Sequence, residues 1–221
     1  MSTDLHGQVP DDADTVLLLI DVINDMDFEG NEELLKRIED VGKKIRELKR
    51  AAKAAGIPAV YVNDNFNRWR SNFHSLLEHC LNDNVPGKIL AELLKPEKED
   101  YFVLKPKHSG FYCTPLEILL DHFHAKNVIL TGFAGNICVL FTANDAYMRG
   151  YNITIPSDCV DSNTTEENEA SLNQMKKLCK ADVRKSSEII KDMIKQEKQL
   201  KTDQNQPQKI EKKTAGDKKK T

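Results

Sequence analysis

Within residues 127–149 the spacing of the apolar residues changes from that of a strand to that of a helix. Residues 128–130 form a short apolar run that ends at Gly132, a pattern typical of a fully buried parallel strand. From Asn136 onward the apolar residues recur at steps of three and four, which is the period of a helix. This stretch therefore predicts a strand, a tight glycine-containing turn and a helix, with Cys138 in the first turn of that helix.

The same alternation of strand and helix patterns extends over most of the chain. Apolar strand patterns cover residues 15–20, 59–62, 101–104, 128–130, 153–155 and 181–183. Helical patterns cover residues 32–55, 73–81, 88–94, 114–124, 136–149, 165–179 and 186–195. Such alternation is typical of right-handed βαβ crossovers. It predicts an α/β protein with three layers, α/β/α, in which helices cover both faces of a doubly wound, mainly parallel six-stranded sheet.

The chain of 221 residues is long enough for one domain of moderate size. We expect this domain to cover residues 14–195, after a mobile leader at residues 1–13. Residues 196–221 are rich in Lys and Gln, lack aromatic residues and are predicted to be disordered. A lysine-rich tail can contact RNA or acidic lipid, but we prefer to interpret it as a solubilising end.

Composition argues against several classes of protein. The N-terminus is polar and acidic, unlike a secretory signal, and the apolar run at residues 16–20 is far too short to span a bilayer. The five cysteines are scattered and never spaced as Cys-x-x-Cys, so neither a zinc knuckle nor a disulfide framework is indicated. The chain before the lysine-rich end is acidic, which argues against a nucleic-acid-binding surface. We therefore expect a cytoplasmic protein with reduced thiols that acts on a small molecule and binds neither membranes nor nucleic acid.

Three reactive side chains, Asp21, Lys105 and Cys138, each follow a different predicted strand. Because ligands bind beyond the carboxyl ends of strands in an open parallel sheet, we expect these groups to meet there as a nucleophile with an oriented base. A position at a helix N-terminus should lower the pKa of the Cys138 thiol, and the free amides there can hold an oxyanion. The alternative is that Cys138 is a small packed residue and Asp21 a turn or capping residue.

The residues around these positions form four short motifs. They are Ile20-Asp21, the sequence KPKHSGF from Lys105 to Phe111, Cys138-Val139, and TANDA at 142–146, and Asp158 after the fifth strand also fits. In this order and at this spacing the motifs resemble the isochorismatase-like cysteine hydrolase family, which is related to nicotinamidases and N-carbamoylsarcosine amidase. The resemblance covers roughly residues 14–190, nearly the whole of the expected domain.

The resemblance implies an activity and a role for each residue. It implies a cysteine amidohydrolase that cleaves a C–N bond of a small amide, carbamoyl or ureido substrate through a thioester acyl-enzyme. By position, Cys138 would be the nucleophile, Asp21 the base and Lys105 their electrostatic partner. A cis peptide bond would join Phe133 to Ala134, and the amides of Ala134 and Cys138 would form an oxyanion hole. Members of the family are often dimers or tetramers, so a homo-oligomer is also expected.

Two departures from the family pattern limit what it implies. Nicotinamidases carry Asp-x-His after the second strand and a further His for a metal, whereas here Asp64 fits but Phe66 occupies the His position. His74 and His79 are five residues apart, off a common helical face, so we expect no metal and no cofactor. Isochorismatases proper cleave a vinyl ether and need no thiol, which Cys138 argues against. An isochorismatase-type hydrolase, a catalytically silent binding or scaffold domain, and a redox sensor stay open as alternatives.

Four further side chains flank the motifs and are candidates to contact a substrate. They are Phe28, Asn65, Trp69 and Phe111, which would line a small, partly aromatic pocket. Each of them is alternatively a residue of the core or of a packed loop. The sequence does not identify the substrate itself.

Overall fold

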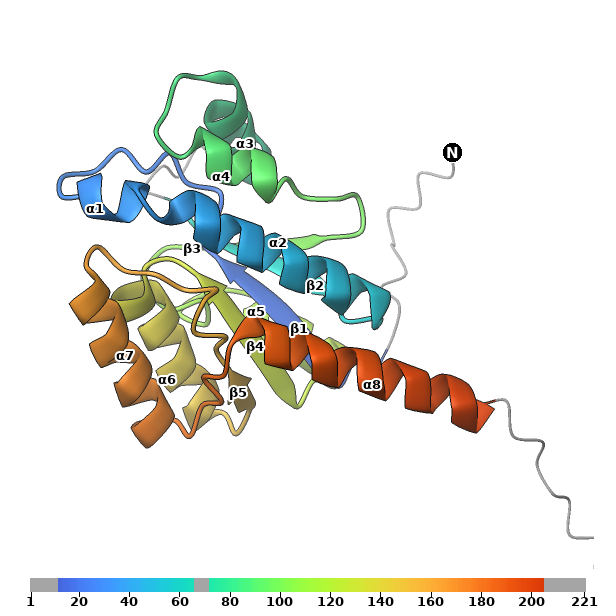
Figure 1. The fold of residues 1–221 in the computed structure, drawn as a ribbon. Coiled ribbons are helices and arrows are strands. Elements are labelled where there is room, and N and C mark those ends of the chain that lie inside the picture. The colour runs from blue at the N-terminus through green and yellow to red at the C-terminus, as the bar shows by residue number, and fades with distance from the viewer. Residues whose placement is uncertain (1–11, 66–71, 205–221) are drawn as a thin grey trace, which may run out of the picture.

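Residues 12–65 and 72–204 are described by a computed structural model, shown in Figure 1. At its centre is a sheet of five parallel strands in the order β3-β2-β1-β4-β5. The strands are β1 Thr15–Ile20, β2 Ala59–Asp64, β3 Tyr101–Lys105, β4 Asn127–Gly132 and β5 Asn152–Thr154. Because β1 pairs with β2 on one side and β4 on the other, the carboxyl ends of these three strands lie together at one edge of the sheet.

Helices cover both faces of the sheet (Figure 1). They are α1 Glu32–Leu35, α2 Ile38–Ala54, α3 Phe73–Asn82, α4 Lys88–Leu93, α5 Leu116–His122, α6 Leu140–Met148, α7 Thr165–Leu178 and α8 Ser186–Gln204, and a π-helical turn, η1 Gly135–Val139, precedes α6. Alternate residues of β1 enter two separate cores. Leu17 and Leu19 pack with α2, α3, α4 and α8, whereas Leu18 and Ile20 pack with α5, α6 and α7. The predicted three-layer α/β/α fold is therefore confirmed, and the two-sided burial explains why β1 is continuously apolar.

The sheet has five strands where the sequence pattern predicts six. The segment at 181–183 contributes a single bridge, between Thr154 and Asp182. Two hydrogen bonds hold Asp182 to this edge, because its amide donates to Ile153 and its carbonyl accepts from Ile155. Beyond Asp182 the amide of Arg184 donates to the Asp182 carboxylate instead of to the neighbouring backbone, although its carbonyl accepts from the Ser157 amide. The regular pairing of a strand is therefore not continued past the bridge.

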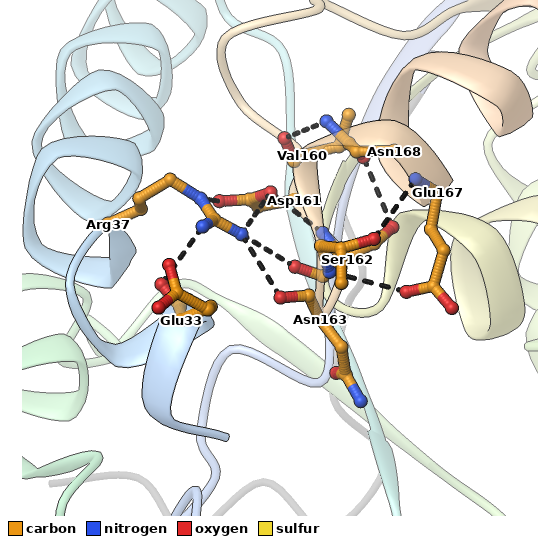
Figure 2. A network of polar contacts seen from close by, with 9 residues as sticks. Glu33, Arg37, Val160, Asp161, Ser162, Asn163, Glu167 and Asn168 are labelled. Carbon is orange, nitrogen blue, oxygen red and sulfur yellow. Dashed lines mark hydrogen bonds and ion pairs between the residues drawn. The ribbon is translucent and has the colours of Figure 1, made fainter. Parts of the chain in front are cut away.

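The helix predicted at 32–55 is interrupted at residues 36–37. In a continuous helix the Arg37 amide would donate to the carbonyl of Glu33. Here that amide donates to Leu34, and the Glu33 carbonyl accepts a 2.9 Å hydrogen bond from the Arg37 guanidinium instead. The break directs the Arg37 side chain toward residues 161–163, as Figure 2 shows.

The last helix is longer than the sequence pattern predicts. α8 reaches Gln204, whereas the pattern predicts an end near Lys195 followed by disorder. Residues 196–204 contain neither Gly nor Pro and are mostly Gln, Lys and Glu, which all favour a helix. Most of the leader at 1–13 and the tail beyond residue 204 lie outside the described residues. No helix within 12–65 or 72–204 is long and apolar enough to cross a membrane.

Candidate active site

Asp21, Lys105 and Cys138 meet at the carboxyl edge of the sheet. Asp21 directly follows β1, Lys105 is the last residue of β3, and Cys138 lies in η1 after β4. The Lys105 ammonium nitrogen Nζ is 2.8 Å from Asp21 Oδ2 and 3.4 Å from Cys138 Sγ. The Cys138 thiol and the Asp21 carboxylate also lie close enough for each to shift the pKa of the other. The structure thus brings together the three groups that the strand ends predict.

A second carboxylate completes the surroundings of Lys105. Asp64 lies at the carboxyl end of β2, and its Oδ2 is 3.3 Å from Lys105 Nζ. The Asp64 amide also donates a 2.6 Å hydrogen bond to Asp21 Oδ1. Lys105 is fully buried, so its charge is held by these two carboxylates. Asp64 ends its strand at the same edge of the sheet as the other three residues, so its place in the sequence is a signal for this contact as well as for a metal ligand.

Burial and neighbouring charges shift the pKa of each group. Burial raises the pKa of the Asp21 carboxyl above its usual 3.8, and Lys105 opposes this shift. Burial alone would lower the pKa of Lys105, but the Asp21 carboxylate, the Cys138 sulfur and Asp64 outweigh it, so that the pKa of the ammonium is raised. Burial, with the Asp21 carboxylate beside it, raises the pKa of the Cys138 thiol to about 12. At neutral pH the site therefore holds an ammonium and a protonated thiol.

The expected drop in the pKa of Cys138 is therefore wrong for the resting protein. A helix N-terminus lowers the pKa of a thiol, but burial in apolar surroundings raises it. In the fold the sulfur is largely withdrawn from water and faces the negative charge of Asp21, and both effects oppose a thiolate. Since Lys105 Nζ contacts both the sulfur and the Asp21 carboxylate, Asp21 is placed to take the thiol proton when the sulfur reacts.

The turn that carries Cys138 has an unusual backbone. The peptide bond between Phe133 and Ala134 is cis, as the family resemblance implies. The carbonyl of Ala134 accepts hydrogen bonds of 3.1 Å from the amides of Ile137 and Val139, the residues on either side of Cys138. This pairing winds the backbone into η1, which contains Cys138. Ala134 and Cys138 both line the cavity described next, where their amides can face a ligand.

A cavity of about 370 Å³ opens beside the sulfur of Cys138. Apolar side chains form most of its wall, and the carboxylates of Asp21 and Asp64 are the acidic groups in it. The lining residues are Asp21, Asn24, Met26, Phe28, Leu34, Asp64, Phe133, Ala134 and Cys138. A concave, mostly apolar site with a few convergent polar groups is typical of small-molecule binding.

The four predicted substrate contacts have different outcomes. Phe28 lines the cavity and is 39% exposed, so it is available to a ligand. Asn65 is not among the lining residues, and its amide donates to the Lys105 carbonyl. Phe111 is also absent from the wall, because its ring is buried in the core near α5 and stacks on Tyr151. Trp69 lies outside the described residues.

Other motif residues form hydrogen bonds that connect the segments carrying Lys105 and Cys138. The Ser109 hydroxyl donates to the Asp145 carboxylate, which joins the loop after β3 to α6. The Thr142 hydroxyl accepts from the Gly110 amide at 2.9 Å and donates to the Cys138 carbonyl at 2.7 Å. The segment that follows Lys105 is therefore fastened to the helix that follows Cys138.

Metal binding finds no support in the described part of the chain. Within residues 12–65 and 72–204, no three His, Cys, Asp or Glu side chains are grouped so that they could hold a metal ion. Phe66, at the position of the nicotinamidase His, lies outside those residues. Asp158, after β5, has a structural contact instead, because its carboxylate accepts hydrogen bonds from the amide and hydroxyl of Ser186 at the start of α8.

Comparison with known proteins agrees with this arrangement. The family model of the isochorismatase domain matches residues 15–188. The chain is 42% identical over 178 residues to the isochorismatase family protein YaaI of Bacillus subtilis (strain 168), a match that covers 80% of this chain and 97% of YaaI. It is 30% identical over 166 residues to a ureidoacrylate amidohydrolase RutB of Methylorubrum extorquens, which covers 63% of this chain and 67% of RutB.

A solved structure shows the same fold. The nicotinamidase PncA from Bacillus subtilis superposes with a TM-score of 0.58 at 29% sequence identity, over 78% of this chain and 100% of that one. The match of the family model over residues 15–188 and the 42% identity to YaaI point to one conclusion. This chain belongs to the isochorismatase family of hydrolases.

Proposed function

We propose that this protein is a cysteine amidohydrolase that cleaves a C–N bond of a small amide, carbamoyl or ureido compound. The observation that carries the proposal is the contact of Lys105 Nζ with both the Asp21 carboxylate, at 2.8 Å, and the Cys138 sulfur, at 3.4 Å. The cavity of about 370 Å³ beside that sulfur has the size of a small-molecule site.

In the acylation step Asp21 accepts the thiol proton while the Cys138 sulfur attacks the carbonyl carbon of the substrate. The carbonyl oxygen becomes an oxyanion, which the amides of Ala134 and Cys138 stabilise. The ammonium of Lys105, which its raised pKa keeps protonated, lowers the energy of the sulfur as negative charge develops on it. The tetrahedral intermediate then collapses, the C–N bond breaks, and Asp21 returns the proton to the leaving nitrogen.

The second half of the reaction hydrolyses the thioester. Asp21, again a carboxylate, takes a proton from a water molecule that attacks the thioester carbonyl. The C–S bond breaks, the sulfur recovers a proton from Asp21, and the acid product leaves. A carboxyl with a raised pKa suits both directions of this transfer, because its carboxylate is a stronger base than that of an ordinary aspartate and its protonated form can return the proton.

Named relatives support the choice of a C–N bond. RutB is a ureidoacrylate amidohydrolase and PncA is a nicotinamidase, and both names describe hydrolysis at a carbonyl bonded to nitrogen. An isochorismatase-type reaction has less support, because it gives no role to a sulfur held between an ammonium and a carboxylate.

A screen of small amides, carbamoyl and ureido compounds for ammonia release tests the proposal. Wild type is compared with Cys138→Ala and with Cys113→Ala, which removes an exposed cysteine and serves as the matched control. We expect wild type and Cys113→Ala to hydrolyse the same compounds at similar rates. The rate of Cys138→Ala should fall by more than about 10³-fold, since it lacks the nucleophile. Full activity in Cys138→Ala would contradict the proposal, and inactivity of wild type on every compound would favour a silent binding domain.

A further inference from the structure

Figure 2 shows that Arg37, between α1 and α2, is joined to Asp161, Ser162 and Asn163 by polar contacts. Asp161 and Ser162 in turn bond to the turn that carries Cys138. We infer that Arg37, acting through Asp161 and Ser162, is a positioning residue that sets the geometry of the oxyanion hole. The inference rests on the proposed function, because it assigns Arg37 a part in the acyl transfer proposed above. Arg37 itself does not line the cavity, so it acts through its partners.

The guanidinium of Arg37 holds a segment far along the chain. Its Nε donates to Asp161 Oδ2 at 2.7 Å and its Nη2 to Asp161 Oδ1 at 3.3 Å. The same Nη2 lies 2.9 Å from the Ser162 carbonyl and 3.4 Å from the Asn163 carbonyl. The Asp161 side chain is 7% exposed. A fork-shaped contact of this kind, partly withdrawn from water, fixes orientation as well as distance.

The segment that Arg37 holds contacts the turn directly. The carbonyl of Asp161 accepts a 2.7 Å hydrogen bond from the Gly135 amide, and the Ser162 hydroxyl oxygen accepts one of 3.0 Å from the Asn136 amide. These two amides follow Ala134 immediately. On the other side of the cis bond, the Gly132 amide donates to the carbonyl of Cys159 at 2.9 Å. Residues 159–162 therefore hold the backbone on both sides of Phe133–Ala134.

The turn at Gly135 and the segment at residues 161–162 are packed too closely for one to move without the other. A Cβ atom at Gly135 would lie 2.4 Å from Asn168 Oδ1 and 3.0 Å from Ser162 Oγ, so the turn lies directly against the segment and the start of α7. Since the amides of Gly135 and Asn136 are fixed by their acceptors, the orientation of the neighbouring Ala134 amide is fixed with them. A change at Asp161 is thus transmitted to a donor of the proposed oxyanion hole.

The segment has a second anchor that does not involve Arg37. Asn168 of α7 donates to the Val160 carbonyl at 3.2 Å, and its Oδ1 is 3.3 Å from Ser162 Oγ. The N-terminus of α7 is itself closed by a capping box between Thr164 and Glu167. Loss of Arg37 should therefore loosen the segment without unfolding it, so that a kinetic effect can be measured.

Two reagents that attack the same sulfur separate positioning from general damage. p-Nitrophenyl acetate acetylates a thiol through a tetrahedral oxyanion and releases p-nitrophenolate. Iodoacetamide alkylates a thiol by displacing iodide and forms no oxyanion. Both rates are measured at one pH for wild type, Arg37→Gln, Arg37→Lys and Asp161→Asn, and the rate of Cys138→Ala is subtracted as the background from the other cysteines. Arg184→Gln is the matched control, because Arg184 also pairs with carboxylates, those of Asp182 and Asp192.

We expect Arg37→Gln and Asp161→Asn to lower the acetylation rate of Cys138 by about 10-fold or more, since loss of a whole oxyanion donor costs about 10²–10³-fold. Their alkylation rates should stay within about twofold of wild type, because neither residue touches the sulfur. Arg37→Lys should resemble Arg37→Gln, since an ammonium cannot reproduce the fork. Arg184→Gln should change neither rate.

Other results would overturn the inference. Unchanged acetylation in Arg37→Gln and Asp161→Asn would show that the hole does not depend on this network. An equal loss of both rates would indicate a structural effect on the thiol rather than on the oxyanion. Acetylation of wild type no faster than that of Cys138→Ala has a different meaning, because it would contradict the proposed function itself. If Arg37→Gln does not fold, Arg37→Lys and Asp161→Asn carry the same comparison.

Discussion

The ammonium nitrogen of Lys105 lies 3.4 Å from the sulfur of Cys138, although the thiol is protonated in the resting site. The attraction between these two groups is therefore small until the sulfur loses its proton to Asp21. It then becomes large, because opposite charges at this distance interact strongly where water is excluded. In this account Lys105 stabilises the transient thiolate more than the ground state, which is the condition for faster reaction.

Replacement of Lys105 tests how its charge supports the fold. Lys105→Met keeps most of the side-chain volume but leaves the carboxylates of Asp21 and Asp64 facing each other without a cation. Removing one partner of a buried ion pair costs about 3–5 kcal/mol, so the free energy of unfolding, measured with urea, should fall by that order. Lys43→Met, which removes an exposed lysine paired with Glu39, is the control and should change it little. Equal effects of the two variants would contradict the assignment of a buried charge cluster.

The pH dependence of hydrolysis tests Asp21 as the base. Burial raises the pKa of this carboxyl above 3.8, so it gains a proton at a higher pH than an exposed aspartate does. Activity that requires the carboxylate is complete at pH values well above the raised pKa and is lost as the pH falls through it. We therefore expect the acid limb of kcat/KM to have its midpoint above 3.8. Asp21→Asn should lower kcat/KM by about 10²–10⁴-fold and remove that limb. A midpoint at or below 3.8 would argue against Asp21.

The backbone before Cys138 requires a glycine at position 132. Gly132 has a φ of +111°, and a Cβ atom there would lie 1.9 Å from the carbonyl oxygen of Ile20 in the neighbouring strand. Gly132→Ala should therefore destabilise the protein by about 3 kcal/mol or more, or prevent folding. Gly56→Ala is the control, because Gly56 also has a positive φ, of +74°, but its Cβ would meet open space. It should cost about 1–2 kcal/mol. Thermal unfolding of the two variants checks the difference, and a similar stability would refute the steric argument.

The meeting of Asp21, Lys105 and Cys138 could be predicted from the sequence for a simple reason. Each residue ends or follows a strand of the sheet, and parallel strands place their carboxyl ends at the same edge. The strand patterns predict which residue ends each strand. The order of the strands in the sheet then determines how close these end residues lie to one another. Asp64 follows the same rule. Its contact with Lys105 is not among the predictions because the sequence motif suggests only a metal ligand at Asp64.

Other features depend on distances that no local pattern contains. The pKa of the Cys138 thiol is governed by burial and by Asp21, which lies on another strand. Arg37 fits the helical pattern of the sequence. In the structure its guanidinium donates hydrogen bonds to the Glu33 carbonyl and to the Asp161 carboxylate, and the helix is interrupted there. Phe111 is the last residue of the motif that begins at Lys105, but its ring packs in the core. In each case a tertiary contact overrides the local preference.

The most direct measurement of the central claim is the mass of the protein during turnover. Wild type, mixed with a compound that it hydrolyses and quenched with acid, is analysed by intact-mass spectrometry and peptide mapping. We predict an added mass equal to the acyl group of that compound on the peptide that contains Cys138, sensitive to hydroxylamine, and no such species in Cys138→Ala. Hydrolysis of the compound by Cys138→Ala at the wild-type rate, or an acyl group carried on another residue, would contradict the account.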